Sequence, residues 1–172
     1  MLSATISNLP DVKLKRDLDS IRKSLDDEGG NVRNLIRQLR DTSDHGPAHD
    51  LIEKLEILLA LARSRWNVNV QLKDSQFRML VPDWLSLEIQ QLVREAISNS
   101  VRHGFADQVS VCCNRKRDGI WISIYDNGKG FNVKLQTPKS ITERVADLKG
   151  EALYYSQAGS TQVAIRLPSI EI

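Results

Sequence analysis

Apolar positions between residues 88 and 104 recur with the period of an α-helix. When this stretch is placed at about 100° per residue, one side carries Ile89, Val93, Ala96, Ile97 and Ser100. We interpret that side as the face that packs on the core. A second side carries four polar residues about one turn apart, namely Glu95, Asn99, Arg102 and His103. A carboxylate, an amide, a guanidinium and an imidazole in one row are suited to holding a metal–phosphate pair.

The N-terminal residues follow a different pattern, with a four–three spacing. Its positions are Leu14, Leu18, Ile21, Leu25, Glu28, Val32, Leu35 and Leu39. All but one are apolar, as in a heptad seam. Gly29 and Gly30 interrupt the middle and would cost roughly 2 kcal/mol in a helix, so a two-helix hairpin is one alternative. The register continues across the glycines and favours one long helix packed against a partner helix. A single amphipathic helix folded onto its own domain is the third reading.

A polar cluster at residues 41–47 separates this region from the rest of the chain. We therefore predict two parts, residues 1–46 and a domain at residues 47–172. Within the domain the patterns predict helices over 50–64, 84–104 and 140–150, and strands over 68–72, 108–114, 120–125, 152–156 and 161–167. Asp83 is the expected N-cap of the second helix, and Ser140 to Glu143 reads as a capping box for the third. This order predicts an α+β fold, a mixed β-sheet with helices on one face.

Composition changes this picture little. The net charge is +2 over 172 residues and charges of both signs alternate, which gives no nucleic-acid footprint. No apolar run is long enough to span a bilayer and the N-terminus lacks a signal-peptide core, so we expect a cytoplasmic chain without a membrane segment. Cys112 and Cys113 are neighbours in a predicted strand and point to opposite faces. That placement suits neither a disulfide nor a metal site, and we expect two small packed side chains.

Four motifs carry a family resemblance. They are E-x-x-x-N-x-x-R-H at residues 95–103, D-N-G-K-G-F at 126–131, I-T-E-R-V-A-D-L-K-G at 141–150 and G-S-T-Q-V-A-I-R-L-P at 159–168. Together they resemble the ATP-binding catalytic domain of two-component sensor histidine kinases, nearest to the nitrate-sensor and desaturase-sensor subfamily. That family shares its superfamily with gyrase and MutL ATPases. The resemblance covers residues 50–168 with the motifs in the correct order. It implies a two-layer sandwich of a mixed β-sheet and helices, with ATP lying between the helices and the sheet.

The resemblance implies roles for the polar row at the phosphate end of this site. Asn99 matches the asparagine that ligates Mg²⁺, an ion that takes oxygen ligands and few protein groups. Glu95 matches the acid that orients or deprotonates the reacting group. Arg102 and His103 match positions near the phosphates. Without the other motifs, the same residues would read as an ordinary exposed helix face, with His103 as a cation at the helix end.

At the base end, Asp126 matches the aspartate that accepts a hydrogen bond from the adenine amino group. Gly128 and Gly130 would let the backbone approach the nucleotide closely. Thr161 matches a threonine placed near the adenine. Without a nucleotide, Asp126 to Gly128 would be an ordinary turn between strands, and Thr161 would be a strand residue with good β-propensity.

One segment departs from the family pattern. Residues 133–140 correspond to a glycine-containing lid over the phosphates, but here the segment has no glycine and contains Pro138. This departure puts the usual backbone cradle for phosphate in doubt, and Lys134 or Lys139 could supply a point charge in its place. A smaller departure is Ser160, which stands where a glycine commonly precedes the threonine.

The expected function is transfer of the γ-phosphoryl group of ATP to a histidine, with ATP and Mg²⁺ as cofactors and a response regulator as partner. In the subfamily the acceptor lies on the first helix of a dimeric hairpin, and residues 14–40 resemble only the second helix, so residues 11–40 are the expected homodimer contact. His45 and His49 are in no acceptor-like motif, which places the acceptor histidine outside this chain. The chain is then either a fragment of a longer kinase, such as the cytosolic part of a membrane-bound sensor, or a protein that has lost the acceptor.

Two other functions stay open from the sequence. The glycine-poor lid is compatible with a degenerate, non-catalytic binding or dimerisation module that has lost ATP turnover. A serine protein kinase of the anti-sigma type shares the nucleotide motifs, but the heptad segment ahead of the domain argues against it.

Overall fold

A five-stranded sheet forms one layer of the domain. The computed structural model describes residues 48–133 and 137–169. The strand order is β2-β4-β5-β7-β6, with bounds Asn69–Leu72 (β2), Gln108–Lys116 (β4), Gly119–Asp126 (β5), Glu151–Gln157 (β6) and Ser160–Leu167 (β7). Strand β2 pairs parallel with β4, and the other pairs are antiparallel. The sheet is therefore mixed, as the sequence predicts.

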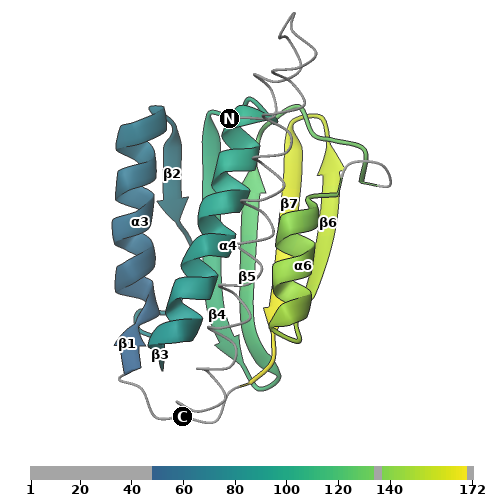
Figure 1. The fold of residues 1–172 in the computed structure, drawn as a ribbon. Coiled ribbons are helices and arrows are strands. Elements are labelled where there is room, and N and C mark those ends of the chain that lie inside the picture. Colours follow the sequence, from purple (N-terminus) through teal and green to yellow (C-terminus); the bar gives the residue numbers. More distant parts are fainter. Residues whose placement is uncertain (1–47, 134–136, 170–172) are drawn as a thin grey trace, which may run out of the picture. The chain divides into compact units, whose positions relative to one another are not determined.

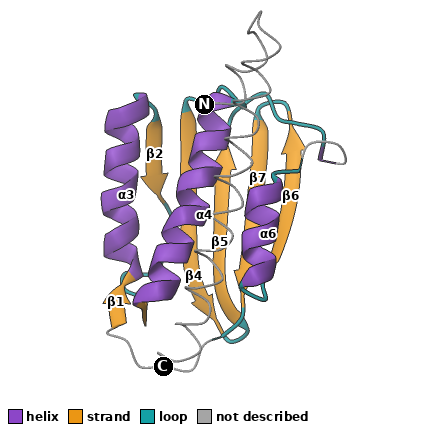
Figure 2. Ribbon diagram, in the orientation of Figure 1, coloured by secondary structure: helices purple, strands orange, loops and turns teal. Residues whose placement is uncertain are grey.

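Within the described residues, three helices form the second layer. They are α3 (Leu51–Trp66), α4 (Asp83–Arg102) and α6 (Lys139–Asp147), and all three cover the same face of the sheet (Figure 1). Figure 2 shows the purple helices standing side by side in front of the orange strands. The predicted two-layer α+β sandwich is confirmed for the described residues. The chain divides into two units between Asp44 and His45, and the heptad segment and its homodimer contact lie outside the described residues.

The core lies between these layers because each element turns one apolar face toward the other layer. Along β4 and β5 the buried residues alternate with half-buried or exposed ones, and the apolar stripe of α4 packs over them. The fully buried side chains include Leu55, Leu59, Ile89, Leu92, Ile97, Ile122, Ile124 and Ile165. Cys113 belongs to this core and Cys112 lies half-buried on the other face, both as free thiols. The predicted opposite orientation of the two cysteines is confirmed.

Two predicted helix caps are wrong. Helix α4 begins at Asp83, with Pro82 as the N-cap residue and no side-chain cap, because β3 (Leu80–Pro82) pairs with β1 (Ala48–Asp50) and leads straight into the helix. Helix α6 begins at Lys139, since the carbonyl of Pro138 accepts the Thr142 N–H at 3.1 Å. Ser140 therefore lies inside the first turn and does not cap the helix. Strands β1 and β3, three residues each, were not predicted at all.

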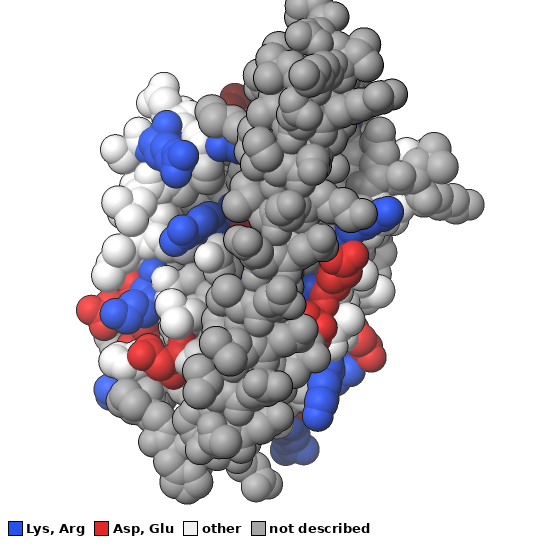
Figure 3. Space-filling model, viewed as in Figure 1, with Lys and Arg blue, Asp and Glu red and all other residues white. Residues whose placement is uncertain are grey.

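Charges on the visible face of the described residues are of both signs. Figure 3 shows Lys and Arg intermixed with Asp and Glu rather than gathered into one large patch. No helix of the described part is long and apolar enough to cross a membrane.

Candidate functional site

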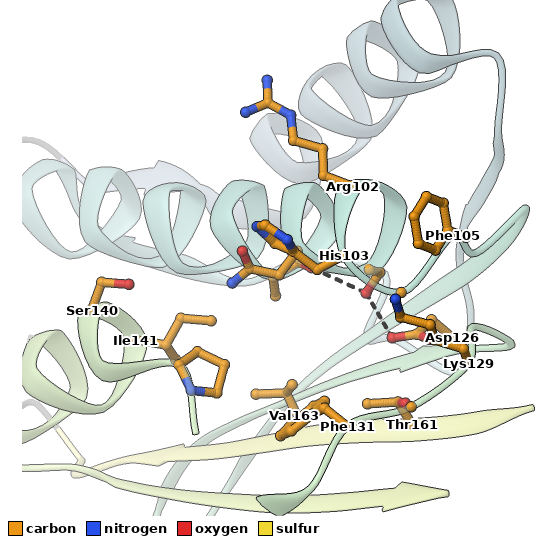
Figure 4. A pocket seen from close by; sticks show the side chains of 16 residues that line it. Arg102, His103, Phe105, Asp126, Lys129, Phe131, Ser140, Ile141, Thr161 and Val163 are labelled. Atoms are coloured by element: carbon orange, nitrogen blue, oxygen red, sulfur yellow. Dashed lines mark hydrogen bonds between the residues drawn. The ribbon is translucent and has the colours of Figure 1, made fainter. Parts of the chain in front are cut away.

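A cavity of about 490 Å³ opens between α4, α6 and the turn that follows β5. Its lining comes from the last turns of α4, the loop after α4, the turn after β5, the start of α6 and strand β7 (Figure 4). The cavity brings together six predicted site residues: Asn99, Arg102, His103, Asp126, Gly130 and Thr161. Glu95 and Gly128 lie next to it but do not line it.

The end of α4 presents three polar side chains to this region. The carbonyl of Asn99 accepts the N–H groups of His103 at 2.9 Å and Gly104 at 3.0 Å, which closes the helix beside the cavity. The side chains of Asn99, Arg102 and His103 make no hydrogen bond or ion pair with any described residue. In Figure 4 the guanidinium of Arg102 extends to the side of α4 away from the strands, so it would have to turn to meet a ligand. The amide of Asn99 is half-buried and His103 is exposed.

Asp126 is the last residue of β5 and is fixed by two hydrogen bonds. Its Oδ1 accepts the N–H of Gly128 at 2.9 Å, and its Oδ2 accepts the hydroxyl of Ser100 at 2.7 Å. Ser100 is buried on the core face of α4, so the pattern that assigned it to packing missed its polar contact. The half-buried carboxylate is held in one orientation and retains lone pairs for a ligand.

The turn after β5 needs its glycines. A Cβ on Gly128 would lie 2.7 Å from the Gly104 carbonyl oxygen, and one on Gly130 would lie 2.7 Å from that of Gln157. Gly130 also has a φ of +73°, which side chains disfavour. Hydrogen bonds from Lys129 N–H to the Gly104 carbonyl and from Gly159 N–H to the Gly128 carbonyl, both 2.8 Å, tie the turn to its neighbours. The two glycines therefore let the turn pack closely against the loop after α4 and the end of β6, and Gly130 also lines the cavity.

Thr161 faces Asp126 across the sheet, because the two residues are paired in the β5–β7 register. It is buried, and its hydroxyl lies 3.1 Å from that of Ser156, which in turn accepts the Phe131 N–H at 2.8 Å. Thr161 thus takes part in a small network that holds the glycine turn in place. The structure thus places Thr161 beside Asp126.

Glu95 contacts the start of α6 and does not line the cavity itself. Its carboxylate accepts a hydrogen bond from the hydroxyl of Ser140, on the first turn of α6. Burial raises the pKa of nearby Tyr154, and the negative charge of Glu95 raises it further. One turn along α6, Arg144 lies 2.8 Å from Glu88 of α4, with both side chains less than a fifth exposed. Helix α6 is therefore joined to α4 by two polar contacts.

Sequence reasoning missed several lining residues. Phe105 and Lys129 flank Asp126, and Pro138, Ser140 and Ile141 reach the cavity from the lid side. The only signal for Lys129 was its place inside the glycine motif, and nothing in the sequence pointed to Phe105. Among the described residues no group of three or more His, Cys, Asp or Glu could hold a metal ion, so a bound cation would depend on few protein ligands.

Comparison with known proteins places this site in context. Residues 85–159 match the family model described as histidine kinase-, DNA gyrase B- and HSP90-like ATPase. The sensor histidine kinase LiaS of Bacillus subtilis is 28% identical over 98% of this chain and 48% of its own length. The sensor protein VraS of Staphylococcus aureus is 27% identical over 96% of this chain and 50% of its own length. The chain thus spans about half the length of the curated relatives it matches.

Solved structures share the fold. The ATP-binding domain of PrrB from Mycobacterium tuberculosis superimposes with a TM-score of 0.60 at 23% identity, covering 73% of this chain and 98% of that one. The Acinetobacter baumannii histidine kinase AdeS gives a TM-score of 0.58 at 17% identity, covering 97% of this chain and 90% of that one. At such identities these two structures speak for the architecture alone.

Proposed function

We propose that this chain, which carries the ATP-binding catalytic domain of a two-component sensor histidine kinase, transfers the γ-phosphoryl group of ATP to a histidine outside the chain. One observation carries the proposal. The Asp126 carboxylate, oriented by two hydrogen bonds, lies in a cavity beside a glycine turn whose crowded backbone leaves no room for side chains. Such a site presents an oriented acceptor and bare backbone to a nucleotide.

At the base end, Asp126 accepts a hydrogen bond from the exocyclic amino group of adenine. The carboxylate is suited to this because both oxygens are acceptors and neither donates. Gly128 and Gly130 let the backbone approach the nucleotide, and Thr161 stands beside the base. Binding at this end holds the nucleotide so that its phosphates lie along the end of α4.

At the phosphate end, Asn99 provides an oxygen ligand for Mg²⁺. The fit is good because its side-chain amide has no partner among the described residues and because Mg²⁺ is held mostly by phosphates and water. When bound, the ion neutralises charge on the phosphates during transfer. Arg102 and His103 add positive charge or hydrogen-bond donors there, the former after its side chain turns toward the ligand.

Glu95 orients or deprotonates the reacting group of the acceptor. It lies one turn before Asn99 on α4, and its half-buried carboxylate already accepts a proton donor, the Ser140 hydroxyl. Phosphoryl transfer needs mainly positioning and charge stabilisation, so a fixed carboxylate near the phosphates suits this role. Ser140 is then the group that the acceptor would displace or join.

The intact protein would work with partners. One relative is named a sensor histidine kinase and the other a sensor protein, which supports a response regulator as the next acceptor. The nitrate-sensor and desaturase-sensor subfamily is our nearest class on the resemblance of the four motifs. We propose homodimerisation through residues 11–40 and a cytosolic position for this domain. Both rest on the heptad pattern and the resemblance.

A second candidate is supported by the lid side of the cavity. Segment 133–140 has no glycine, and the cavity is lined there by Pro138, Ser140 and Ile141. Side chains in place of a backbone cradle weaken phosphate binding. If they prevent it, the domain is a non-catalytic binding or dimerisation module built on the same fold.

Calorimetric titration of ATP into the chain, with and without Mg²⁺, separates the two. For a kinase domain we expect binding that depends on Mg²⁺, and we expect Asn99→Ala to remove that dependence. Gln91→Ala is the matched control, because Gln91 is exposed on the same helix two turns earlier. Equal ATP binding by wild type and Asn99→Ala would contradict the metal assignment. Undetectable binding by the wild type would favour the non-catalytic module.

Transfer itself is tested with γ-labelled ATP and a separate polypeptide that carries an acceptor histidine. Glu95→Gln should bind ATP as the wild type does and lose most of the transfer rate, because the amide keeps the shape but neither attracts nor accepts a proton as well. A Glu95→Gln variant that transfers phosphate at the wild-type rate would remove Glu95 from the mechanism.

A further inference from the structure

Phe105 holds an unfavourable backbone conformation without gaining burial. Its φ is +56°, in the left-handed region that bulky residues avoid, yet its side chain is 73% exposed. The conformation is set by the neighbouring backbone, where Gly104 N–H bonds to the Asn99 carbonyl and Ala106 N–H bonds to the Ser100 carbonyl, both at 3.0 Å. Glycine or asparagine would fit this position with less strain. A strained, exposed aromatic residue at a cavity is a sign of function.

The ring lies at the base end of the cavity. Phe105 and Lys129 both line it, and the Lys129 ammonium lies 4.5 Å from the centroid of the Phe105 ring. The Lys129 backbone is fixed as well, since its N–H donates to the Gly104 carbonyl at 2.8 Å. Figure 4 shows Phe105, Lys129 and Asp126 grouped at the same end of the pocket. The ring is thus held by a cation–π contact next to the carboxylate proposed to bind the base.

We propose that Phe105 is a further residue of the nucleotide site, where its ring stacks on the base and favours purine over pyrimidine nucleotides. This inference rests on the proposed ATP-binding function. An aromatic ring beside a hydrogen-bond acceptor provides the two contacts that a base needs, one for its face and one for its edge. A purine covers more of the ring than a pyrimidine does, so stacking separates the two classes. Asp126 alone does not, because adenine and cytosine both carry an amino group.

The test is calorimetric titration of the full chain with Mg²⁺-ATP and Mg²⁺-CTP. Loss of base–aromatic stacking in Phe105→Ala should weaken ATP binding roughly tenfold and CTP binding by much less. Phe105→Trp should keep the affinity for ATP. Phe77→Ala is the matched control, because Phe77 is 98% exposed and does not line the cavity; it should bind both nucleotides as the wild type does.

The variant Phe105→Gly distinguishes a loss of stability from a loss of nucleotide affinity. Glycine adopts positive φ freely, so this variant should unfold at no lower temperature than the wild type while losing the same affinity for ATP. ATP binding by Phe105→Ala within twofold of the wild type would overturn the inference. Equal losses for ATP and CTP would do so too, because the ring would then act on the ribose or phosphates. Undetectable ATP binding by the wild type would instead contradict the proposed function, and this inference would fail with it.

Discussion

The contact between Arg144 of α6 and Glu88 of α4 offers a quantitative test of how the lid side is held. The two charged groups are 2.8 Å apart, and their side chains are 18% and 17% exposed. Arg144→Met keeps most of the side-chain length but leaves the Glu88 carboxylate without its cation. Breaking a fully buried pair costs about 3–5 kcal/mol, and because water reaches part of this one we expect about 2–3 kcal/mol.

A second ion pair in the same domain is the control. Arg166 and Glu151 lie 3.0 Å apart, but their side chains are 30% and 68% exposed. Exposed pairs contribute about 1 kcal/mol or less, so Arg166→Met should cost far less than Arg144→Met. For a domain of this size, the expected fall in melting temperature is about 10 °C for Arg144→Met and about 3 °C or less for Arg166→Met.

Thermal and urea unfolding of both variants measure these differences. The double variant Glu88→Leu with Arg144→Met leaves no unpaired charge at this contact and should recover most of the lost stability. The reasoning fails if Arg144→Met is no less stable than Arg166→Met, or if the double variant is as unstable as Arg144→Met alone. Because α6 brings Ser140 and Ile141 to the cavity, Arg144→Met should also weaken nucleotide binding.

Three further predictions follow from single positions. Gly130→Ala should lower the free energy of unfolding by about 2 kcal/mol or more. The φ of +73° disfavours a side chain, and an added Cβ would lie 2.7 Å from the Gln157 carbonyl oxygen. A variant as stable as the wild type in urea unfolding would contradict this. Burial raises the pKa of Cys113 to about 12 from 9.0, so a thiol reagent should not modify it in the folded protein at pH 8, and stability should fall as the pH rises from about 9 toward 12 because only the unfolded thiol ionises there; rapid modification without unfolding would contradict this. Asn99→Ala should leave the melting temperature within about 2 °C of the wild type, because its side chain has no partner among the described residues; a loss like that of a core variant would give Asn99 a structural role.

Much of the fold could be predicted because the hydrophobic periodicity of each helix and strand is visible within a short stretch of sequence. The apolar stripe of α4 and the alternation in β4 and β5 each appear within a dozen residues, so the order of elements and the mixed sheet are confirmed. The resemblance to ATP-binding domains of sensor histidine kinases is supported as well, because residues 85–159 match the family model described as histidine kinase-, DNA gyrase B- and HSP90-like ATPase. Strands β1 and β3 were not predicted, because three residues are too few to show the alternation of a strand.

The contacts that complete the site could not be predicted in the same way. Ser140 meets Glu95 across 45 positions and Arg144 meets Glu88 across 56, so neither partner is visible from local sequence. The spacing of Ser140 to Glu143 predicts a helix cap, but the Ser140 hydroxyl donates a hydrogen bond to Glu95 instead. Phe105 was missed because its role depends on a backbone conformation that the sequence does not favour. The nucleotide roles of the individual site residues stay predictions.

The most direct test of the account is calorimetric titration of Mg²⁺-ATP into the wild type, Asp126→Asn and Asp74→Asn. Asp74 is an exposed loop residue with positive φ, which asparagine tolerates, so its variant is the control. An amide at residue 126 cannot accept from Ser100 and Gly128 and still present an acceptor to adenine. We expect micromolar binding by the wild type and by Asp74→Asn, a free energy of roughly −7 to −8 kcal/mol, and none by Asp126→Asn. Equal binding by Asp126→Asn, or no binding by the wild type, would contradict the account.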